Sequence, residues 1–335
     1  MLEKTEKIIK FAFKYPPNYL LMVTTIIRCM MLRSLPMSIA TVLMGCACAT
    51  LAGNLDPTSA ILCLLFAPVA QITANLYHVY RDQKCHYGEN IDRGIADMKY
   101  GDISLEQLLR EAYRAFGILT LTLGLTIILF APIMGCIFGT LLLLAIYLNS
   151  AGPYPLCRSP WNMVITFLFF GPLGVIATSY VQAVHGTGTP PGMIVDLAPA
   201  LFAGICMGCF AVNSLIFHDY RTYEENVNND KRTFCVVFGK RNTAFLFFFN
   251  SAVIFFVSLY ICITYHFHNV YWAMVVPLIC TIYNFWLGVH AVKDTGKMNT
   301  PWENLINWNM LLYALSGFIE FHFFGLPEDA LFRYF

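Results

Sequence analysis

Residues 58–82 read TSAILCLLFAPVAQITANLYHVYRD, an apolar stretch that ends abruptly in polar and charged side chains. The apolar part is long enough to cross the hydrocarbon core of a membrane as a helix, which takes roughly 18–25 residues. Polar groups at the end of such a helix cost free energy unless they face a cavity or a partner. The stretch therefore predicts a membrane helix whose end serves a function.

The composition of the whole chain agrees with this prediction. Of its 335 residues, 58% are hydrophobic and only 12% are charged, and the mean hydropathy is +0.60. Soluble proteins of this length carry about a quarter charged residues, so we expect a polytopic membrane protein with the lipid bilayer as its surroundings. The net charge of +1 gives no general attraction to nucleic acid, and we expect no such partner.

The hydropathy of the chain predicts an all-α fold with nine membrane spans. The expected spans are 34–53, 58–80, 113–131, 132–150, 161–182, 194–219, 243–265, 270–292 and 307–325. We expect one domain over residues 33–335, preceded by a basic amphipathic segment, residues 1–32, that lies along the membrane surface. Lysines spread through that segment, without a compact apolar stretch, argue against a secretory signal.

Positive charge predicts the orientation of the spans. Nine spans with a cytoplasmic N-terminus place the basic loops in the cytoplasm, namely 81–112, 150–160, 221–242 and 293–306. The opposite loops contain neither Lys nor Arg, and they lie near 54–57, 183–193 and 266–269. Because cytoplasmic loops are enriched in Lys and Arg, we expect an integral protein of the cell inner membrane. The two long polar loops then lie on one face.

The twelve cysteines suggest packing and not a disulfide framework or a metal site. Most of them lie inside apolar windows, and the single CxxC pair, Cys206 and Cys209, has no second pair. Cysteine behaves as a small hydrophobic side chain in such surroundings.

A first group of polar residues lies at the end of the second predicted span. Spacings of three and four place Asn75, His78 and Asp82 on one helical face, with Arg81 beside them. An ordinary solvated helix end is the alternative. Polar groups at membrane depth usually face an internal cavity, which favours a functional role for Asn75, His78 and Asp82.

A second group lies at the matching end of the sixth span. There, Asp219, Thr222 and Asn226 share one helical face, and Arg221 precedes Glu225 by one turn. The basic residues Lys231 and Arg232 follow. A solvated loop is again the alternative, but two such groups at equivalent helix ends on one face indicate a shared site.

Carboxylates and cations at the mouth of an apolar helix bundle suit a diphosphate with a long apolar tail. The tail needs a lipid-like interior, and the head needs Mg²⁺ held by carboxylates or Arg and Lys directly. Neutralising the leaving diphosphate lets the allylic C–O bond ionise. We therefore expect a substrate with a diphosphate head on a long apolar tail, bound by Mg²⁺ as cofactor or by Arg and Lys directly.

These residues resemble the UbiA superfamily of intramembrane prenyltransferases, and within it the enzymes that prenylate 1,4-dihydroxy-2-naphthoate. The likeness extends over roughly residues 33–320. It comprises RSLP at 33–36, NLYHVYRD at 75–82, GDIS at 101–104, GPYPL at 152–156, FLFFGP at 167–172, YVQ at 180–182, Arg221, and KRT at 231–233. The resemblance implies a nine-helix bundle with a central cavity that opens to the cytoplasmic side.

The chain departs from the family pattern at several motif positions. In the first motif, the Asn and the first Asp of the family fall on His78 and Val79, which leaves Asp82. In the second motif, the two family aspartates fall on Thr222 and Asn226, and Asp230 replaces the usual Gly. These departures call into question the two-magnesium arrangement of the family.

The resemblance implies transfer of a polyprenyl group from its diphosphate to an aromatic acceptor such as dihydroxynaphthoate, in quinone biosynthesis. Carried over by position, Asn75 and Asp82 would bind metal or diphosphate, and Arg221 and Lys231 the diphosphate. The residues themselves add further candidates. Asp219 would replace a lost metal ligand, and His78 would contact the diphosphate or accept a proton; Arg81, Arg232 and Glu225 complete the expected substrate-binding set.

Two other functions fit the same residues. An intramembrane terpene cyclase would ionise the same diphosphate but quench the cation with its own tail. A non-catalytic isoprenoid-diphosphate binder or transporter would explain why Val79, Thr222 and Asn226 stand where aspartates are expected. We prefer the prenyltransferase, because the likeness extends beyond the diphosphate motifs.

Overall fold

The computed structural model describes residues 17–84, 104–151, 155–187, 197–265, 270–293 and 302–323. These residues form helices, and none of them forms a strand. The α-helices are α2 (Pro17–Cys29), α3 (Leu35–Leu51), α4 (Pro57–Lys84), α6 (Leu105–Phe130), α7 (Pro132–Ser150), α8 (Trp161–Phe170), α9 (Pro172–Thr187), α10 (Ala198–Arg221), α11 (Tyr223–Asn228), α12 (Phe234–Thr264), α13 (Val270–Lys293) and α14 (Trp302–Phe323). Two short 3₁₀ turns, η1 (Leu32–Ser34) and η2 (Leu156–Arg158), lie between them.

Seven of the described helical stretches are long and apolar enough to cross a membrane, and an eighth apolar helix, Met274–His290, is shorter. They coincide with the first eight predicted windows, and α14 coincides with the ninth. The chain therefore has helices of the length and composition expected of an integral membrane protein. The count of nine spans stays a prediction, as do the orientation and the cavity that opens to the cytoplasm.

The chain divides into two compact units. The first unit comprises residues 1–32 and 69–120, and the second comprises residues 33–68 and 121–335. The units also separate after residue 32, but residues 69–120 group with residues 1–32. The predicted division into a lead-in segment and one domain stays a prediction. Each unit is described by itself below.

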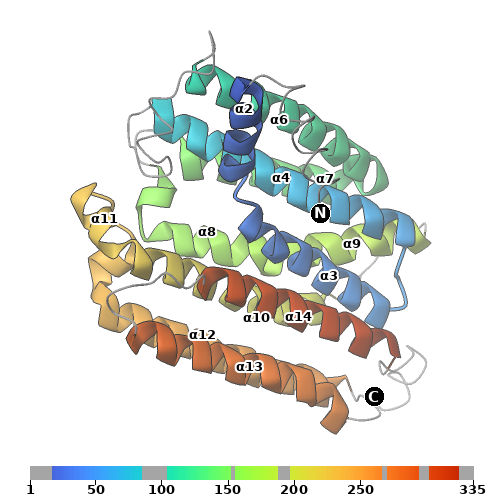
Figure 1. Cartoon of the computed structure of the whole chain (residues 1–335). Helices are drawn as coiled ribbons and strands as arrows, with labels where there is room; N and C mark the ends of the chain where they lie inside the picture. The colour runs from blue at the N-terminus through green and yellow to red at the C-terminus, as the bar shows by residue number, and fades with distance from the viewer. Residues whose placement is uncertain are drawn as a thin grey trace, which may run out of the picture. The chain divides into compact units, whose positions relative to one another are not determined.

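Helix α10 is the core helix of the second unit. Its apolar window is 78% buried, and it packs against α3, α8, α9, α12 and α14 (Figure 1). Helix α14 also packs along α3 and α13, and α12 along α13. The end of α10 is therefore held on several sides by neighbouring helices.

The predicted span 161–182 is broken into α8 and α9 at Gly171. A Cβ atom on Gly171 would lie 2.6 Å from the Gly204 carbonyl oxygen and 2.7 Å from the Gly208 Cα atom, both in α10. The Thr41 hydroxyl donates a hydrogen bond of 2.8 Å to the Phe170 carbonyl, which ends α8. Glycine is thus required where α8 and α10 cross, since small residues let membrane helices approach closely.

A cluster of buried polar side chains joins α10, α12 and α13. The Asn213 and Asn284 amides each donate a hydrogen bond to the Ser251 hydroxyl, at 3.3 and 2.9 Å. The Asn250 amide donates to the Asn213 side-chain oxygen at 3.0 Å. Hydrogen bonds between polar side chains hold helices together within apolar surroundings, so this cluster sets the register of the three helices.

The described cysteines are free thiols, as predicted, and all but Cys136 are buried. Cys206 and Cys209 are both buried within α10. Their role as small hydrophobic side chains is consistent with this placement.

Candidate functional site

The polar end of α4 belongs to the first unit. The His78 Nε2 atom lies 3.4 Å from the Asp82 Oδ2 atom, one helical turn away, and Asp82 is 4% exposed. The Asn75 amide donates a hydrogen bond of 3.0 Å to the Met30 carbonyl oxygen, and Arg81 is half-buried. His78 and Asp82 were predicted to share one face of the helix, and in the structure their side chains lie close to each other.

Aromatic packing supports this end of α4. The Tyr113 ring of α6 lies against the rings of Tyr77 and Tyr80, at centroid distances of 5.5 and 5.0 Å. Val79, at the position where the family motif has an aspartate, is fully buried. The first motif thus offers one carboxylate, Asp82, on a helix end held by ring contacts.

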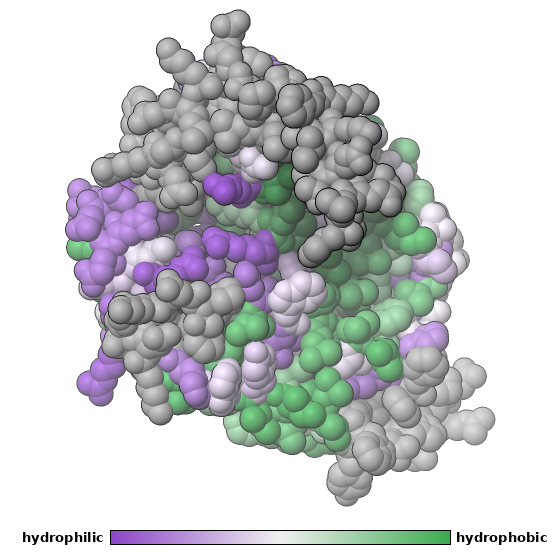
Figure 2. All heavy atoms as spheres, viewed as in Figure 1, coloured by the Kyte–Doolittle hydropathy of each residue, from purple (hydrophilic) through white to green (hydrophobic). Residues whose placement is uncertain are grey.

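The end of α10 gathers the second group, in the second unit. Asp219 is 3% exposed, and Lys231 is 8% exposed and interacts electrostatically with the Asp219 carboxyl group. Arg221 is the last residue of α10, and its side chain is half-buried. Three of the predicted residues, Asp219, Arg221 and Lys231, therefore belong to one polar corner, which we call the α10 corner. Figure 2 shows hydrophilic residues gathered at the end where α11 lies.

The loop after α11 brings Lys231 back to this corner. The Lys231 backbone N–H donates a hydrogen bond of 2.8 Å to the Asn226 carbonyl, and Asp230 has a φ of +51°. Left-handed backbone of this kind favours glycine and is tolerated by Asp and Asn. Asp230 thus has a left-handed backbone at the position where the family pattern has glycine.

The two predicted outer residues of the second group lie away from the buried part of the corner. Helix α10 ends at Arg221 and α11 begins at Tyr223, so Arg221 and Glu225 do not share one continuous helix. Glu225 and Arg232 are both exposed. Their roles in substrate binding stay predictions.

The positions of the missing aspartates are occupied by a hydrogen-bonded pair. The Asn226 amide donates to the Thr222 hydroxyl oxygen at 3.0 Å, and the Thr222 hydroxyl donates to the His218 carbonyl at 2.9 Å. This pair satisfies its polar groups without any carboxylate.

The sequence analysis missed one member of the α10 corner, Glu303 in the first turn of α14. Its Oε1 atom lies 2.8 Å from the Arg221 Nη2 atom and 3.3 Å from the His218 Nδ1 atom. Burial raises the pKa of the Glu303 carboxyl group, but the hydrogen bond with His218 and the electrostatic interactions with His218, Arg221 and Arg33 outweigh burial, so the pKa is lowered. The sequence feature that could have identified Glu303 is its acidic side chain just before the ninth predicted span.

The described carboxylates limit how a metal can be held. No group of three His, Cys, Asp or Glu side chains with a geometry suited to a metal ion occurs among the described residues. Each motif supplies one buried carboxylate, Asp82 or Asp219. Mg²⁺ is usually bound by one or two carboxylates together with substrate phosphates and water, so either carboxylate by itself is a suitable ligand for a metal that arrives with a diphosphate.

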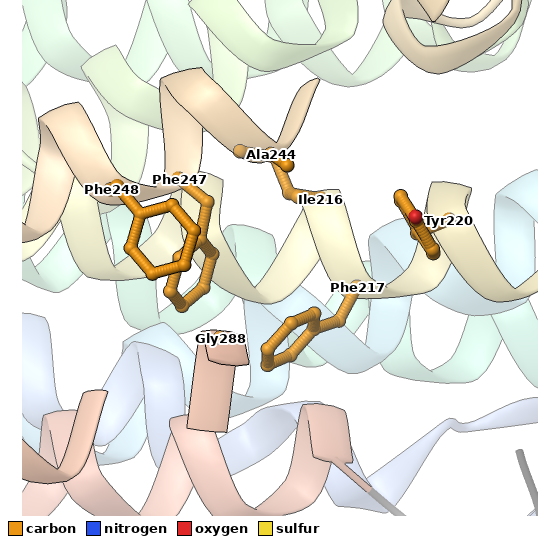
Figure 3. A pocket seen from close by; sticks show the side chains of 7 residues that line it. All are labelled: Ile216, Phe217, Tyr220, Ala244, Phe247, Phe248 and Gly288. Carbon is orange, nitrogen blue, oxygen red and sulfur yellow. The ribbon is translucent and has the colours of Figure 1, made fainter. Parts of the chain in front are cut away.

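A small apolar pocket lies beside the α10 corner (Figure 3). It has a volume of about 10 Å³, and its lining includes the stacked rings of Phe217 and Phe247, whose centroids are 4.9 Å apart. A volume of this size holds at most one water molecule. The pocket is thus a packing gap and not a binding site for a prenyl tail.

Comparison with protein-family models shows that residues 38–311 match the UbiA prenyltransferase family. Among curated proteins, the chain is similar to 1,4-dihydroxy-2-naphthoate octaprenyltransferase of Escherichia coli (strain K12). The two are 27% identical over 220 residues, which is 63% of this chain and 67% of the relative. Both findings agree with the motifs.

Solved structures agree in fold. A UbiA homologue from Archaeoglobus fulgidus bound to DMAPP and Mg²⁺ matches with a TM-score of 0.54 and 18% identity, over 87% of this chain and 99% of that one. A structure described as digeranylgeranylglyceryl phosphate synthase in membranes matches with a TM-score of 0.55 and 16% identity, over 90% and 99%. At these identities the likeness concerns the fold alone.

Proposed function

Because the chain belongs to the UbiA prenyltransferase family, we propose that it transfers a polyprenyl group from a polyprenyl diphosphate to an aromatic acceptor of the dihydroxynaphthoate type. The observation that carries this proposal is the α10 corner, where Arg221 is paired with Glu303 and the buried Lys231 lies near Asp219. Cations that are half-buried or buried bind phosphate oxygens more strongly than cations in water do.

In this proposal, Arg221 and Lys231 donate charge-assisted hydrogen bonds to the diphosphate. These bonds stabilise the negative charge that develops as the allylic C–O bond breaks and its electron pair goes to the leaving diphosphate. An electron-rich carbon of the acceptor then forms the new C–C bond. In the first motif, Asn75 and Asp82 face the same substrate, and His78 contacts the diphosphate or accepts the proton that the acceptor releases.

Mg²⁺ bound with the diphosphate would supply further neutralisation of its charge. Asp82 and Asp219 are the residues that would hold it, each as one carboxylate ligand. The DMAPP-bound and GPP-bound Archaeoglobus fulgidus homologues were solved with Mg²⁺, which supports this cofactor.

The proposal also includes the wider setting. The substrate cavity would open to the cytoplasmic face of the cell inner membrane. The N-terminus would be cytoplasmic, and the chain would span the membrane nine times.

The test is incubation of the purified chain in lipid nanodiscs with a labelled prenyl diphosphate and Mg²⁺, with and without dihydroxynaphthoate. A prenylated product that forms only when the acceptor is present supports the proposal. A hydrocarbon formed without acceptor would identify a terpene cyclase instead. Bound but intact diphosphate would identify a binder or transporter.

A further inference from the structure

The α10 corner contains more fixed positive charge than the family motif alone implies. Arg33, Arg221 and Lys231 act there together with two carboxylates, Glu303 and Asp219. Thr222 and Asn226, where family aspartates are expected, are bonded to each other and bring no charge. Glu303, which belongs to α14 and lies outside both motifs, is the carboxylate on which Arg221 and Arg33 act.

Glu303 holds its partners through a single oxygen. Its Oε1 atom contacts both the Arg221 Nη2 atom, at 2.8 Å, and the His218 Nδ1 atom, at 3.3 Å. A guanidinium group has five N–H donors, and the Arg221 atom that contacts Glu303 is Nη2, one of its three nitrogens. The other N–H groups of the half-buried Arg221 side chain can therefore bind an anion, while Glu303 restrains the direction of the guanidinium group.

The surroundings hold Glu303 itself in place. It is only 8% exposed, and α14 packs against both α3 and α10. One turn further along α14, the Asn307 amide donates a hydrogen bond of 3.1 Å to the Arg33 carbonyl oxygen. A buried carboxylate that lost its cationic partners would be costly, so Glu303 and Arg221 fix each other.

We propose that Glu303 is a positioning residue of the prenyl-transfer site, which orients the Arg221 guanidinium toward the diphosphate of the substrate. Glu303 does not touch the substrate and acts through Arg221. This inference rests on the proposed function, and it extends the site to a helix that the family motifs do not include. In this inference, Arg221, held in place by Glu303, neutralises part of the negative charge of the diphosphate. The missing aspartates would otherwise contribute to that neutralisation by binding a metal.

The test begins with the neutral variant Glu303→Gln. We expect the KM for the prenyl diphosphate to rise about tenfold, and inhibition by inorganic pyrophosphate to weaken by the same factor, because the charge-assisted contact with Arg221 is lost. The KM for the aromatic acceptor should stay within about twofold. Glu303→Asp, which keeps the charge, should restore most of the affinity.

Helix α14 offers a matched control. Glu320 lies in the same helix, is also 8% exposed, and lines a different small cavity with Tyr313 and Ser316. Glu320→Gln should leave both pyrophosphate inhibition and the KM for the prenyl diphosphate unchanged. An equal effect of the two substitutions would assign a merely structural role to Glu303 and overturn the inference.

A double-variant cycle separates positioning from direct binding. If Glu303 acts only through Arg221, then Arg221→Gln combined with Glu303→Gln should bind pyrophosphate no more weakly than Arg221→Gln alone. Losses that multiply would overturn the inference. The binding of inorganic pyrophosphate, followed by calorimetry, needs no turnover. A wild-type chain that forms no prenylated product would refute the proposed function, while the pyrophosphate comparison would still decide the role of Glu303.

Discussion

The Asn226 side-chain amide donates a hydrogen bond of 3.0 Å to the Thr222 hydroxyl oxygen, which in turn donates to the carbonyl of His218 in the last turn of α10. Asn226 is 3% exposed, so its amide has little access to water. This pair connects α11 to the end of α10 by hydrogen bonds between uncharged groups.

Replacement of Thr222 by Val should therefore destabilise the protein. The substitution keeps the shape but removes the hydroxyl, which leaves a buried donor of Asn226 without its acceptor and costs about 1–2 kcal/mol. Thermal unfolding in nanodiscs would measure the loss, and Thr222→Ser, which keeps the hydroxyl, serves as the control. Equal stability of the Val and Ser variants would contradict this account.

Asp82→Asn should lower turnover at least about a hundredfold if Asp82 holds the catalytic metal. The change removes the negative charge but preserves the size of a side chain that is nearly fully buried beside His78. Steady-state rates of prenyl transfer at saturating Mg²⁺ would measure it, and Glu106→Gln, a change of an exposed acid in α6, is the control. Near-normal turnover of the Asp82 variant would exclude the metal-binding role.

The stability of the second unit should decrease in acid because of Asp56, which precedes α4. The Asp56 Oδ2 atom accepts hydrogen bonds from the Ser59 backbone N–H and hydroxyl, at 2.8 and 2.6 Å, and lies 2.7 Å from the His185 Nδ1 atom. Burial raises the pKa of Asp56, but these contacts outweigh it, so the folded-state pKa lies below the ordinary value of 3.8.

A carboxyl group with a lowered pKa stabilises the fold above its unfolded-state pKa, and the contribution is lost as the pH falls through the folded-state value. The thermal midpoint of the wild type should thus drop more steeply below about pH 4 than that of Asp56→Asn. Unfolding scans from neutral pH to pH 2 would measure both, with Glu111→Gln as an exposed control. Parallel curves for wild type and Asp56→Asn would show that the Asp56 contacts contribute nothing.

Gly171→Ala should destabilise the crossing of α8 and α10. The added Cβ atom would lie 2.4 Å from the Phe167 carbonyl oxygen and 2.6 Å from the Gly204 carbonyl oxygen, so backbone would have to move. We expect a loss of about 1–3 kcal/mol, as for other overpacked sites. Gly139→Ala in α7 meets no atom within 4 Å and is the control. A Gly171→Ala variant as stable as Gly139→Ala would refute the close contact.

The apolar windows predicted the helices well, because hydropathy over some twenty residues reports directly on burial in a membrane. The break at Gly171 was missed, since a hydropathy average records composition and not the close approach of two backbones. The pairing of His78 with Asp82 followed from their spacing of four residues. A single sequence shows most directly which residues of a site share one face of a helix.

Glu303 could not be assigned from the sequence, because its partners Arg221 and His218 lie far away along the chain and only the packing of α14 on α10 brings them together. The end of α10 was also misjudged. Periodicity placed Arg221 and Glu225 on one helix, whereas the break at Thr222 turns α11 away and exposes Glu225. Contacts between distant helices and the exact end of a helix depend on tertiary packing, which a pattern of residue types does not contain.

The buried amides that join α10, α12 and α13 also have a consequence for motion. Rotation of one of these helices by a single residue would break the hydrogen bond of Asn213 or of Asn284 to Ser251. These side chains are fully buried, so water cannot replace the lost partner. The three helices therefore form a rigid group, and Arg221 is the last residue of one of them, α10. Whatever loosening admits a bulky isoprenoid must come from helices outside this trio, and amide hydrogen exchange should be slowest within it.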